Sequence, residues 1–337
     1  MLGVYMSSIV EVAKLAGVST ATVSRVISGK GYVSENTKNI VNQVIEELGY
    51  KPSKTASVLA RRTKHKIAVV FSQRIIDLET KDSDLFEGDG FYSIVYKGIK
   101  DRIEKNGFHM DVLVLEKRTK NRFDEYDGFL LVGGDFTKED IEHYKQLRKP
   151  FVLIDQHLKG YPIDSVVSNG YDGAISCIDY LIKKGYQKIF HIHGPLSHYG
   201  FKDRFDGYVD GMQMHGFYPR TFLCDDINDD FNIIIPQIIK HTGIPDCIFA
   251  GNDNMAKKIL RYLISEGYQI PQDIALVGFD DMLFSSIIKP ALSTVKVYKY
   301  EMGDLAVDRL RQLLYQENIH PVKISLHTTF TKRESCR

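Results

Sequence analysis

From residue 66 onward, short apolar runs alternate with longer segments that have the period of an amphipathic helix. The runs include IAVVF, MDVLVL, FLLV, FVLI, KIFHI, CIFA and IALVGF. The segments between them, such as SIVYKGIKDRIEKNG and MAKKILRYLISEG, end at or near glycine, which suits a helix end. Strand–helix alternation of this kind predicts parallel β-sheets with crossover helices. Because about 270 residues are too many for one such sheet, we expect an α/β body with two lobes.

The composition is that of an ordinary globular protein. Of the 337 residues, 43% are hydrophobic and 26% are charged, which is enough apolar material for a sizeable core. The sequence contains no run of ~18 apolar residues and no signal-peptide pattern, so we expect a cytoplasmic protein with no membrane partner. The cysteines form no CxxC pair and indicate reduced thiols, with no metal site and no cofactor. They are Cys177, Cys224, Cys247 and Cys336.

The net charge of +1 conceals a difference between the two parts of the chain. Residues 1–66 contain ten Lys or Arg and four Asp or Glu, whereas the remainder contains 34 basic and 39 acidic residues. A basic head on a mildly acidic body predicts that the head, and not the body, binds a polyanion such as DNA.

The first fifty residues contain three short helical patterns. The first covers residues 9–16 and is followed by Gly17, which suits a left-handed helix end. The second covers residues 20–27 after Ser19, a favourable N-cap, and the third begins at Ser34. Three short helices with a glycine-containing turn between the first two are typical of a helix-turn-helix unit. A helical bundle of unrelated function is the alternative.

The second of these helices has two different sides. Val23, Val26 and Ile27 form the side that we expect to be buried. If the helix enters the major groove of DNA, the residues on or near its other side would contact the bases. Arginine can donate two hydrogen bonds to guanine, and small methyl groups suit the thymine methyl. The candidate DNA-binding residues of this helix are Thr20, Ala21, Ser24 and Arg25.

A basic linker joins this unit to the first apolar run. Residues 53–61 have a helical pattern, but a helix of ~9 residues is marginal alone in water, so it would fold only against a partner. Leu59 is the large apolar side chain of the segment beside Val58, and four Lys or Arg residues follow it closely.

Motifs along the whole chain carry a family resemblance. The head contains VAKLAGVSTATVSRVISG and the linker YKPSKTASVLARR. The body contains KPFVLID, DSVVSNGYDGA, DRFDGYVDGM, GNDNMA, DIALVGFDD and TFTKRES. In these motifs the chain resembles the LacI/GalR (lac repressor) family of bacterial transcription regulators. Stretches such as GFYSIVYKGI look most like the galactoside-responsive branch of that family.

The resemblance implies a helix-turn-helix DNA-binding domain at 7–50, a hinge helix and linker at 51–65, and an effector-binding and dimerisation domain at 66–337. The last domain would contain two Rossmann-like subdomains of the periplasmic-binding-protein type, joined by three crossovers. We place the first subdomain at 66–168 and 296–320, and the second at 169–295 and 321–337.

The resemblance also implies how the head and linker bind DNA. A homodimer would place one head on each half of a pseudo-palindromic operator. Leu59 matches the leucine that the hinge helix inserts into the central minor groove, and Ala56 lies on the face that packs against the partner's hinge helix. The alternative for Leu59 is packing on the body. Thr20, Ala21 and Arg25 match base-reading positions.

Polar residues stand after several predicted strands, where open α/β sheets bind their ligands. Carboxylate and amide groups can bond to sugar hydroxyls, and an arginine can hold a pair of them. By the resemblance, the effector-contacting positions are Asp155, Arg204, Asn252 and Asp280. A helix cap or a surface ion pair is the structural alternative for the charged members. Asp253 and Asp281, which follow directly, are expected to be structural.

Four further residues complete the predicted effector site. Phe91 and Tyr92 fall where the first lobe offers aromatic rings to the cleft, and Ser72 follows the first strand. Phe231 falls near a position where the family places a stacking aromatic, with core packing as the alternative. His191 and His193 alternate on one strand and have no third ligand at metal spacing, so we expect buried histidines there.

The predicted function is a sequence-specific transcription regulator, a repressor of sugar-utilisation genes whose operator affinity changes when a sugar binds between the subdomains. The alternative is a global catabolite regulator with a phosphorylated carrier protein as corepressor. An enzyme is not expected, because the sequence has no phosphate loop and no GxGxxG, GxSxG or HExxH motif. A pure sugar-binding protein would not need the basic head. Both inducer and corepressor action of the sugar stay open.

Overall fold

The computed structural model describes residues 9–28, 33–50, 65–79, 88–115, 123–225, 227–316 and 319–337. The chain divides into two compact units, 1–63 and 64–337, and each is described by itself. Of the predicted hinge and linker, only His65 is among the described residues, so Ala56 and Leu59 lie outside them.

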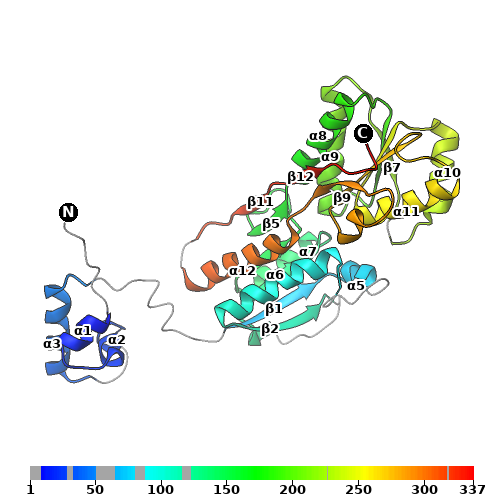
Figure 1. Cartoon of the computed structure of the whole chain (residues 1–337). Helices are drawn as coiled ribbons and strands as arrows, with labels where there is room; N and C mark the ends of the chain where they lie inside the picture. The colour runs from blue at the N-terminus through cyan, green and yellow to red at the C-terminus, as the bar shows by residue number, and fades with distance from the viewer. Residues whose placement is uncertain are drawn as a thin grey trace, which may run out of the picture. The chain divides into compact units, whose positions relative to one another are not determined.

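The head is a bundle of three helices: α1 Ile9–Leu15, α2 Thr20–Ser28 and α3 Glu35–Glu47 (Figure 1). In the turn after α1, Gly17 has a φ of +65°, a conformation that glycine adopts without steric cost. Oγ of Ser19 accepts a hydrogen bond from the amide of Thr22 at 3.1 Å, and Oγ of Ser34 accepts one from Thr37 at 3.3 Å. The predicted starts of the second and third helices are therefore confirmed.

A small apolar core holds the three helices together. Its buried members are Val12, Ala13, Ala16, Val23, Val41, Val44 and Tyr50. The prediction that Ile27 belongs to the buried side of α2 is wrong, because its side chain is 37% exposed. Val26 covers the core only in part. The apolar face of α2 is narrower than its sequence pattern suggests, since Ile27 is the last residue but one of the helix.

Two six-stranded sheets form the body, which confirms the predicted two-lobed α/β fold (Figure 1). The first has the order β11-β5-β4-β3-β1-β2 and is parallel throughout. Its strands are β1 Lys66–Phe71, β2 His109–Val114, β3 Gly128–Val132, β4 Phe151–Ile154, β5 Ser165–Ser168 and β11 Lys323–Leu326. The second has the order β12-β10-β9-β8-β6-β7, with β12 antiparallel to β10. Its strands are β6 Ile189–His193, β7 Arg220–Leu223, β8 Cys247–Ala250, β9 Ala275–Asp280, β10 Ser293–Lys296 and β12 Thr329–Thr331.

Helices cover both sheets. The first sheet and its helices, here called the first lobe, include α5 Gln73–Glu79, α6 Phe91–Asn106, α7 Lys138–Gln146 and α12 Lys299–Tyr315. The second lobe includes α8 Gly170–Lys183, α9 Tyr199–Met214, α10 Phe231–Thr242 and α11 Asp253–Ser265. Two short 3-10 helices, η1 Phe123–Glu125 and η2 Leu283–Ser286, complete the elements. Large apolar side chains of the strands, such as Phe71, Phe129 and Phe249, are fully buried beneath the helices.

The chain crosses between the lobes after β5, after β10 and after β11. The prediction that residues 321–326 belong to the second lobe is wrong, because β11 pairs in parallel with β5, with Lys323 opposite Ser165. The last crossing therefore falls between Leu326 and Thr329. This pairing joins strands that are far apart in the sequence, so local pattern does not reveal it.

Helices α6 and α12 pack side by side on the first lobe (Figure 1). Each of the two helices has a glycine at the point of contact, Gly98 on α6 and Gly303 on α12. A Cβ on Gly98 would lie 2.1 Å from the carbonyl oxygen of Tyr300, and one on Gly303 would lie 2.2 Å from that of Val95. The backbones can approach this closely only where neither residue has a side chain, which fixes α12 firmly to the first lobe.

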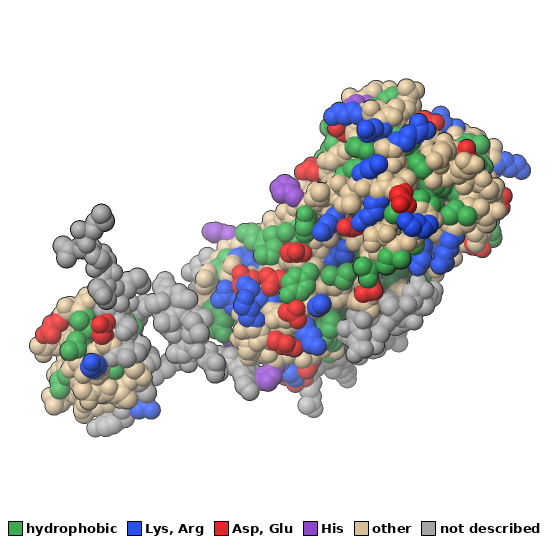
Figure 2. Space-filling model, in the orientation of Figure 1, with side chains coloured by type: hydrophobic (Ala, Val, Ile, Leu, Met, Phe, Trp, Pro, Cys, Tyr) green, Lys and Arg blue, Asp and Glu red, His purple; other side chains and the backbone are tan. Residues whose placement is uncertain are grey.

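Basic and acidic side chains are interspersed on the visible face of the body (Figure 2). This mixture agrees with the mildly acidic balance of the body sequence. Among the described residues, no helix is both long and apolar enough to cross a membrane.

Candidate functional site

A cavity of about 490 Å³ lies between the two lobes of the body. Its volume is within the range of small-molecule sites in proteins. The ends of β4 and β9 and the first turns of α6, α9 and α11 meet around it. Among the residues that line it are Arg74, Phe91, Tyr92, Asp155, His198, Phe201, Arg204, Asn252, Asp280 and Met282.

Asp155 is the first-lobe carboxylate of the cavity. It follows β4 with a φ of +62° and is 3% exposed. The hydroxyl of Tyr92 donates to Oδ2 of Asp155 at 2.8 Å, whereas Oδ1 has no hydrogen-bond partner within the described part of the chain. Burial raises the pKa of Asp155 to about 7, and the bond from Tyr92 and the charge of Arg204 oppose the rise only in part.

Tyr92 also contacts the second lobe. Its hydroxyl oxygen lies 3.4 Å from Nε2 of His198, which stands at the N-cap of α9. Because the Tyr92 proton points to Asp155, we assign the imidazole proton to Nε2, which leaves Nδ1 as an acceptor. Burial lowers the pKa of His198 to about 3, so the ring is neutral at physiological pH. Nδ1 has no partner among the described residues.

Arg204 and Asp280 form a buried ion pair in the second lobe. Nη2 of Arg204 donates to Oδ1 of Asp280 at 2.8 Å, and the two side chains are 6% and 9% exposed. Nη1 donates to the carbonyl of Gly251 at 2.6 Å, and the guanidinium carbon lies 4.0 Å from the centre of the Phe279 ring. Nε of Arg204 has no partner in the described part of the chain. The pair holds Arg204 rigidly and keeps one donor for another molecule.

Asn252 and Asp253 have different roles at the start of α11. Asn252 lines the cavity, and its Oδ1 accepts a hydrogen bond from the amide of Met255 at 2.7 Å, so it caps the helix. Asp253 is fully buried and accepts bonds from Thr294, Met282 and Ser285. The expectation that Asp253 is structural is confirmed.

Asp281 is also structural, because it pairs with Arg333 at 2.5 Å. His191 and His193 are buried on β6, as expected, and each ring has its Nδ1 within hydrogen-bond distance of a backbone carbonyl. Within the described residues, no group of three or more His, Cys, Asp or Glu side chains is placed to hold a metal ion.

The structure places two of the predicted effector residues away from the cavity lining. Phe231 begins α10 and is 3% exposed in the apolar core of the second lobe, so the core-packing alternative describes its position. Ser72 follows β1 and is buried beside Gly133, and it is not among the residues that line the cavity.

Sequence reasoning missed several lining residues. His198 and Arg74 are the most important of them, because both contact the opposite lobe: His198 reaches Tyr92, and Arg74 of α5 lies 3.5 Å from Asp225 after β7. Both follow the ends of central strands, β6 and β1. The strand-end rule that selected Asp155 could therefore have pointed to them.

The head presents α2 as its candidate DNA-contacting element. The side chains of Thr20 and Arg25 are exposed on it. Ala21 and Ser24 belong to the same helix, but their side chains lie outside the described ones. The second helix of such a unit is the one that enters the major groove.

Two parts of the chain match known families. Residues 8–53 match the family described as "Bacterial regulatory proteins, lacI family", and residues 178–336 match the "Periplasmic binding protein-like domain". The probable HTH-type transcriptional repressor ExuR of Bacillus subtilis (strain 168) is 28% identical over 339 residues, covering 98% of this chain and 99% of that protein. The ribose operon repressor of Escherichia coli (strain K12) is 29% identical over 347 residues, covering 98% and 100%.

A solved structure has the same architecture over nearly the whole chain. The lac repressor dimer bound to operator and the anti-inducer ONPF aligns with a TM-score of 0.70 at 24% identity, covering 98% of this chain and 99% of that one. At this identity the similarity shows the fold. With the helix-turn-helix head, the two-lobed body and the full-length relatives, these matches show that the chain is a DNA-binding regulator with a lacI-type DNA-binding domain and a periplasmic-binding-protein-like effector-binding domain.

Proposed function

We propose that this protein is a repressor whose affinity for operator DNA changes when a sugar occupies the cavity between the lobes. One observation carries the proposal. Oδ1 of Asp155, Nδ1 of His198 and Nε of Arg204 all belong to cavity-lining residues and have no hydrogen-bond partner in the described part of the chain. Two acceptors and a donor suit a polyhydroxylated molecule, because each hydroxyl group can both donate and accept. The rings of Phe91 and Phe201 can cover its apolar face.

The names of the relatives support a sugar and a dimer. One relative is named as the repressor of the ribose operon, and the solved neighbour is a dimer bound to operator and an anti-inducer. They favour a small molecule over a phosphorylated carrier protein as the effector. The galactoside-responsive branch remains a prediction. A protein that regulates bacterial operons acts in the cytoplasm, where the DNA is.

For DNA binding we propose a homodimer on a pseudo-palindromic operator. Thr20, Ala21, Ser24 and Arg25 would read bases in the major groove, and Leu59 with Ala56 would form the minor-groove wedge. We also propose that the protein acts by binding alone and is not an enzyme. The names of the full-length relatives support this, because both are named as repressors.

The test uses the full chain. Duplexes that bind it would first be selected from a random DNA library, and the affinity for the selected duplex would then be measured with and without D-ribose, D-galactose, lactose or D-galacturonate. Thermal unfolding with each sugar gives a second readout. A sugar at about 100 times its Kd should stabilise the protein by about 2.7 kcal/mol, or about 5–10 °C.

The proposal requires one compound to raise the melting temperature and to change operator affinity. A phosphorylated carrier protein that changes operator affinity, while none of the sugars has an effect, would favour the catabolite regulator instead. Selection of no specific duplex at all would contradict the assignment of the head.

A further inference from the structure

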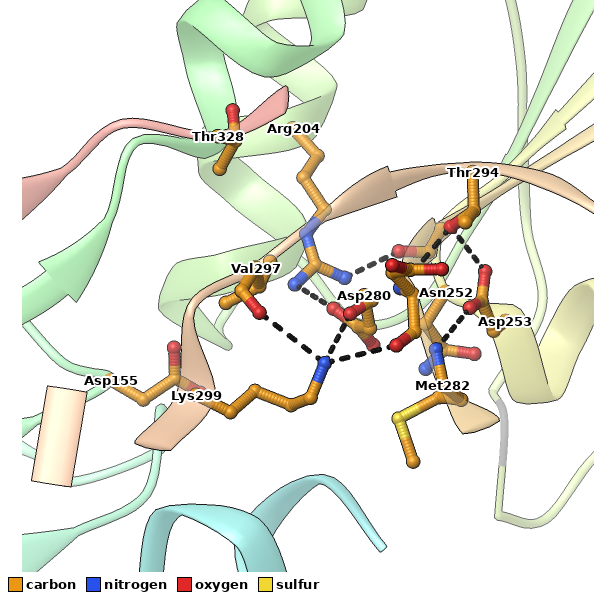
Figure 3. Close-up of polar contacts among 12 residues, drawn as sticks. Asp155, Arg204, Asn252, Asp253, Asp280, Met282, Thr294, Val297, Lys299 and Thr328 are labelled. Carbon is orange, nitrogen blue, oxygen red and sulfur yellow. Dashed lines mark hydrogen bonds and ion pairs between the residues drawn. The ribbon is translucent and has the colours of Figure 1, made fainter. Parts of the chain in front are cut away.

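The ammonium group of Lys299 is buried where the two lobes join (Figure 3). Lys299 is the first residue of α12 and is 5% exposed. Its Nζ donates to the carbonyl oxygens of Asp280, Asp281 and Val297, the last two at 3.3 Å. All three acceptors are therefore backbone groups at the end of β9 or in the crossover that follows β10.

A buried ammonium is costly unless its surroundings compensate for lost hydration, and lysine is among the residues least often fully buried. Burial lowers the pKa of Lys299, while the nearby charge of Asp280 opposes that change. Three carbonyl oxygens supply the acceptors that water would otherwise supply. A methionine would fill the same volume without this cost, so core filling alone gives no reason for the charge.

The backbone that Lys299 holds is an unusual one. Asp280 has a φ of +113° and Asp281 a φ of +53°, which residues with side chains rarely adopt. Such conformations persist where the surroundings fix them, and they cluster at ligand-binding and switching sites. Here they turn both carbonyl oxygens toward Lys299, as the dashed lines in Figure 3 mark.

The carboxylates of Asp280 and Asp281 bind arginines in different parts of the body. Asp280 binds Arg204 at the cavity, at 2.8 Å. Asp281 binds Arg333, which also donates to the carbonyl of Leu292 at 2.8 Å, and so joins the segment that follows β12 to the one before β10. A shift of the backbone at Asp280 would therefore move both the cavity wall and the segments of the second lobe that Asp281 and Arg333 join.

Lys299 itself belongs to the first lobe. Its helix is fixed to α6 through the close contact at Gly98 and Gly303. Its Nζ also lies 5.9 Å from the ring centre of Phe91, which lines the cavity from that lobe. One ammonium group thus connects the first lobe, the second-lobe strand that carries Asp280, and the crossover between them.

We propose that Lys299 is a positioning residue that couples occupancy of the cavity to the angle between the lobes. An effector that binds Asp280 or Arg204 shifts the backbone carbonyl groups to which Lys299 donates. Because Lys299 begins α12, that helix transmits the shift to the first lobe. This inference rests on the proposed function, because it needs an effector in the cavity. It goes further in naming the residue through which that effector acts.

The experiment compares Lys299→Met with the wild-type full chain. Operator affinity is measured on the selected duplex, with and without whichever of D-ribose, D-galactose, lactose or D-galacturonate gives the largest thermal shift for the wild type. Sugar is added until the response saturates, so that a loss of sugar affinity does not count as a loss of coupling. For the wild type we expect the ratio of the two operator affinities to be about 5–150-fold.

In Lys299→Met the ratio should fall to within about twofold of unity at saturating sugar, while the variant still binds sugar and DNA. The matched control is Lys296→Met, since Lys296 ends β10 three residues earlier and is exposed. It should keep the wild-type ratio. A lysine that only stabilises the fold would lower the melting temperature and leave the ratio at saturation unchanged, and that result would overturn the proposal.

Two further outcomes are informative. If Lys299→Met does not fold, as judged by circular dichroism, Lys299→Gln takes its place, because the amide keeps two donors without the charge or the reach. The same ratio then decides, and an unchanged value rejects the coupling role. If the wild type itself shows no sugar-dependent change in operator affinity, the proposed function fails first.

Discussion

The hydroxyl group of Tyr92 lies 2.8 Å from Oδ2 of Asp155 and donates its proton to it, which links the first turn of α6 to the end of β4. The two side chains are 5% and 3% exposed. The bond stabilises the ionised carboxylate and leaves Oδ1 as the oxygen available to an effector. The same hydroxyl contacts His198, so one group of the first lobe meets both a cavity carboxylate and the second lobe.

Tyr92→Phe should weaken sugar binding about tenfold. The change leaves Oδ2 of Asp155 buried without its donor, which costs about 1–3 kcal/mol. Isothermal titration with the sugar identified above measures the effect. Tyr300→Phe is the control, because Tyr300 donates a similar bond to Asp101 on the exposed surface. Equal affinities of Tyr92→Phe and wild type would mean that the hydroxyl does not support the site.

Asp155→Asn should abolish sugar binding and yet stabilise the empty protein, more so at high pH. The folded pKa of Asp155 is about 7, above its ordinary value of 3.8. Between these values the folded state holds a proton that the unfolded state has released, so wild-type stability falls as pH rises through this window. Asparagine has no such proton, and the advantage of the variant should grow between about pH 5 and pH 8.

Urea midpoints at the two pH values test this expectation. Asp179→Asn is the control, because the hydrogen bond from Lys183 lowers the pKa of Asp179, so its carboxyl stays ionised across the range. A constant difference between Asp155→Asn and wild type at both pH values would contradict the assigned burial effect.

Arg204→Met should destabilise the body by about 3–5 kcal/mol, because it leaves the buried carboxylate of Asp280 without its partner. Adding Asp280→Asn should restore most of the stability, since asparagine is neutral and tolerates a positive φ. Sugar binding should stay lost in both variants. Lys183→Met, which removes an exposed pair with Asp179, should change the free energy of unfolding by less than about 1 kcal/mol.

Arg25→Ala should reduce affinity for the selected operator by about 1–3 kcal/mol and relax base preference at one position of each half-site. Binding to unrelated DNA should change little, because base contacts and not phosphate contacts are lost. Competition binding on a set of single-base operator variants measures both effects. Gln43→Ala, on α3, serves as the control. A uniform loss across all sequences would instead assign Arg25 to a phosphate.

The body fold was predictable because its central strands are short continuous apolar runs. IAVVF, FLLV, FVLI, CIFA and IALVGF all became buried parallel strands. The position of the edge strand β11 was not predictable, because its residues KISL are only partly buried. Its pairing with β5, which is far away in the sequence, is what assigns it to the first lobe.

The candidate site was predictable where strand ends carry charged residues, as at Asp155 and Asp280. His198 and Arg74 were missed because they lie several residues beyond the ends of β6 and β1, at the starts of the helices that follow, although the same strand-end rule leads to them. Phe231 shows the reverse error. Its ring lies in the core of the second lobe. The direction in which the first side chain of a helix points depends on packing, and the spacing of residues in the sequence does not specify that packing.

The three crossovers also determine how the body can be made. Helix α12 and strand β11 return to the first lobe after most of the second lobe has been translated, and β12 then returns to the second. During synthesis from the N-terminus, neither lobe can therefore be complete until most of the other lobe has been translated. Folding of the body should be completed for both lobes nearly together, and a nascent chain that stops before residue 299 would expose the apolar surface that α12 covers.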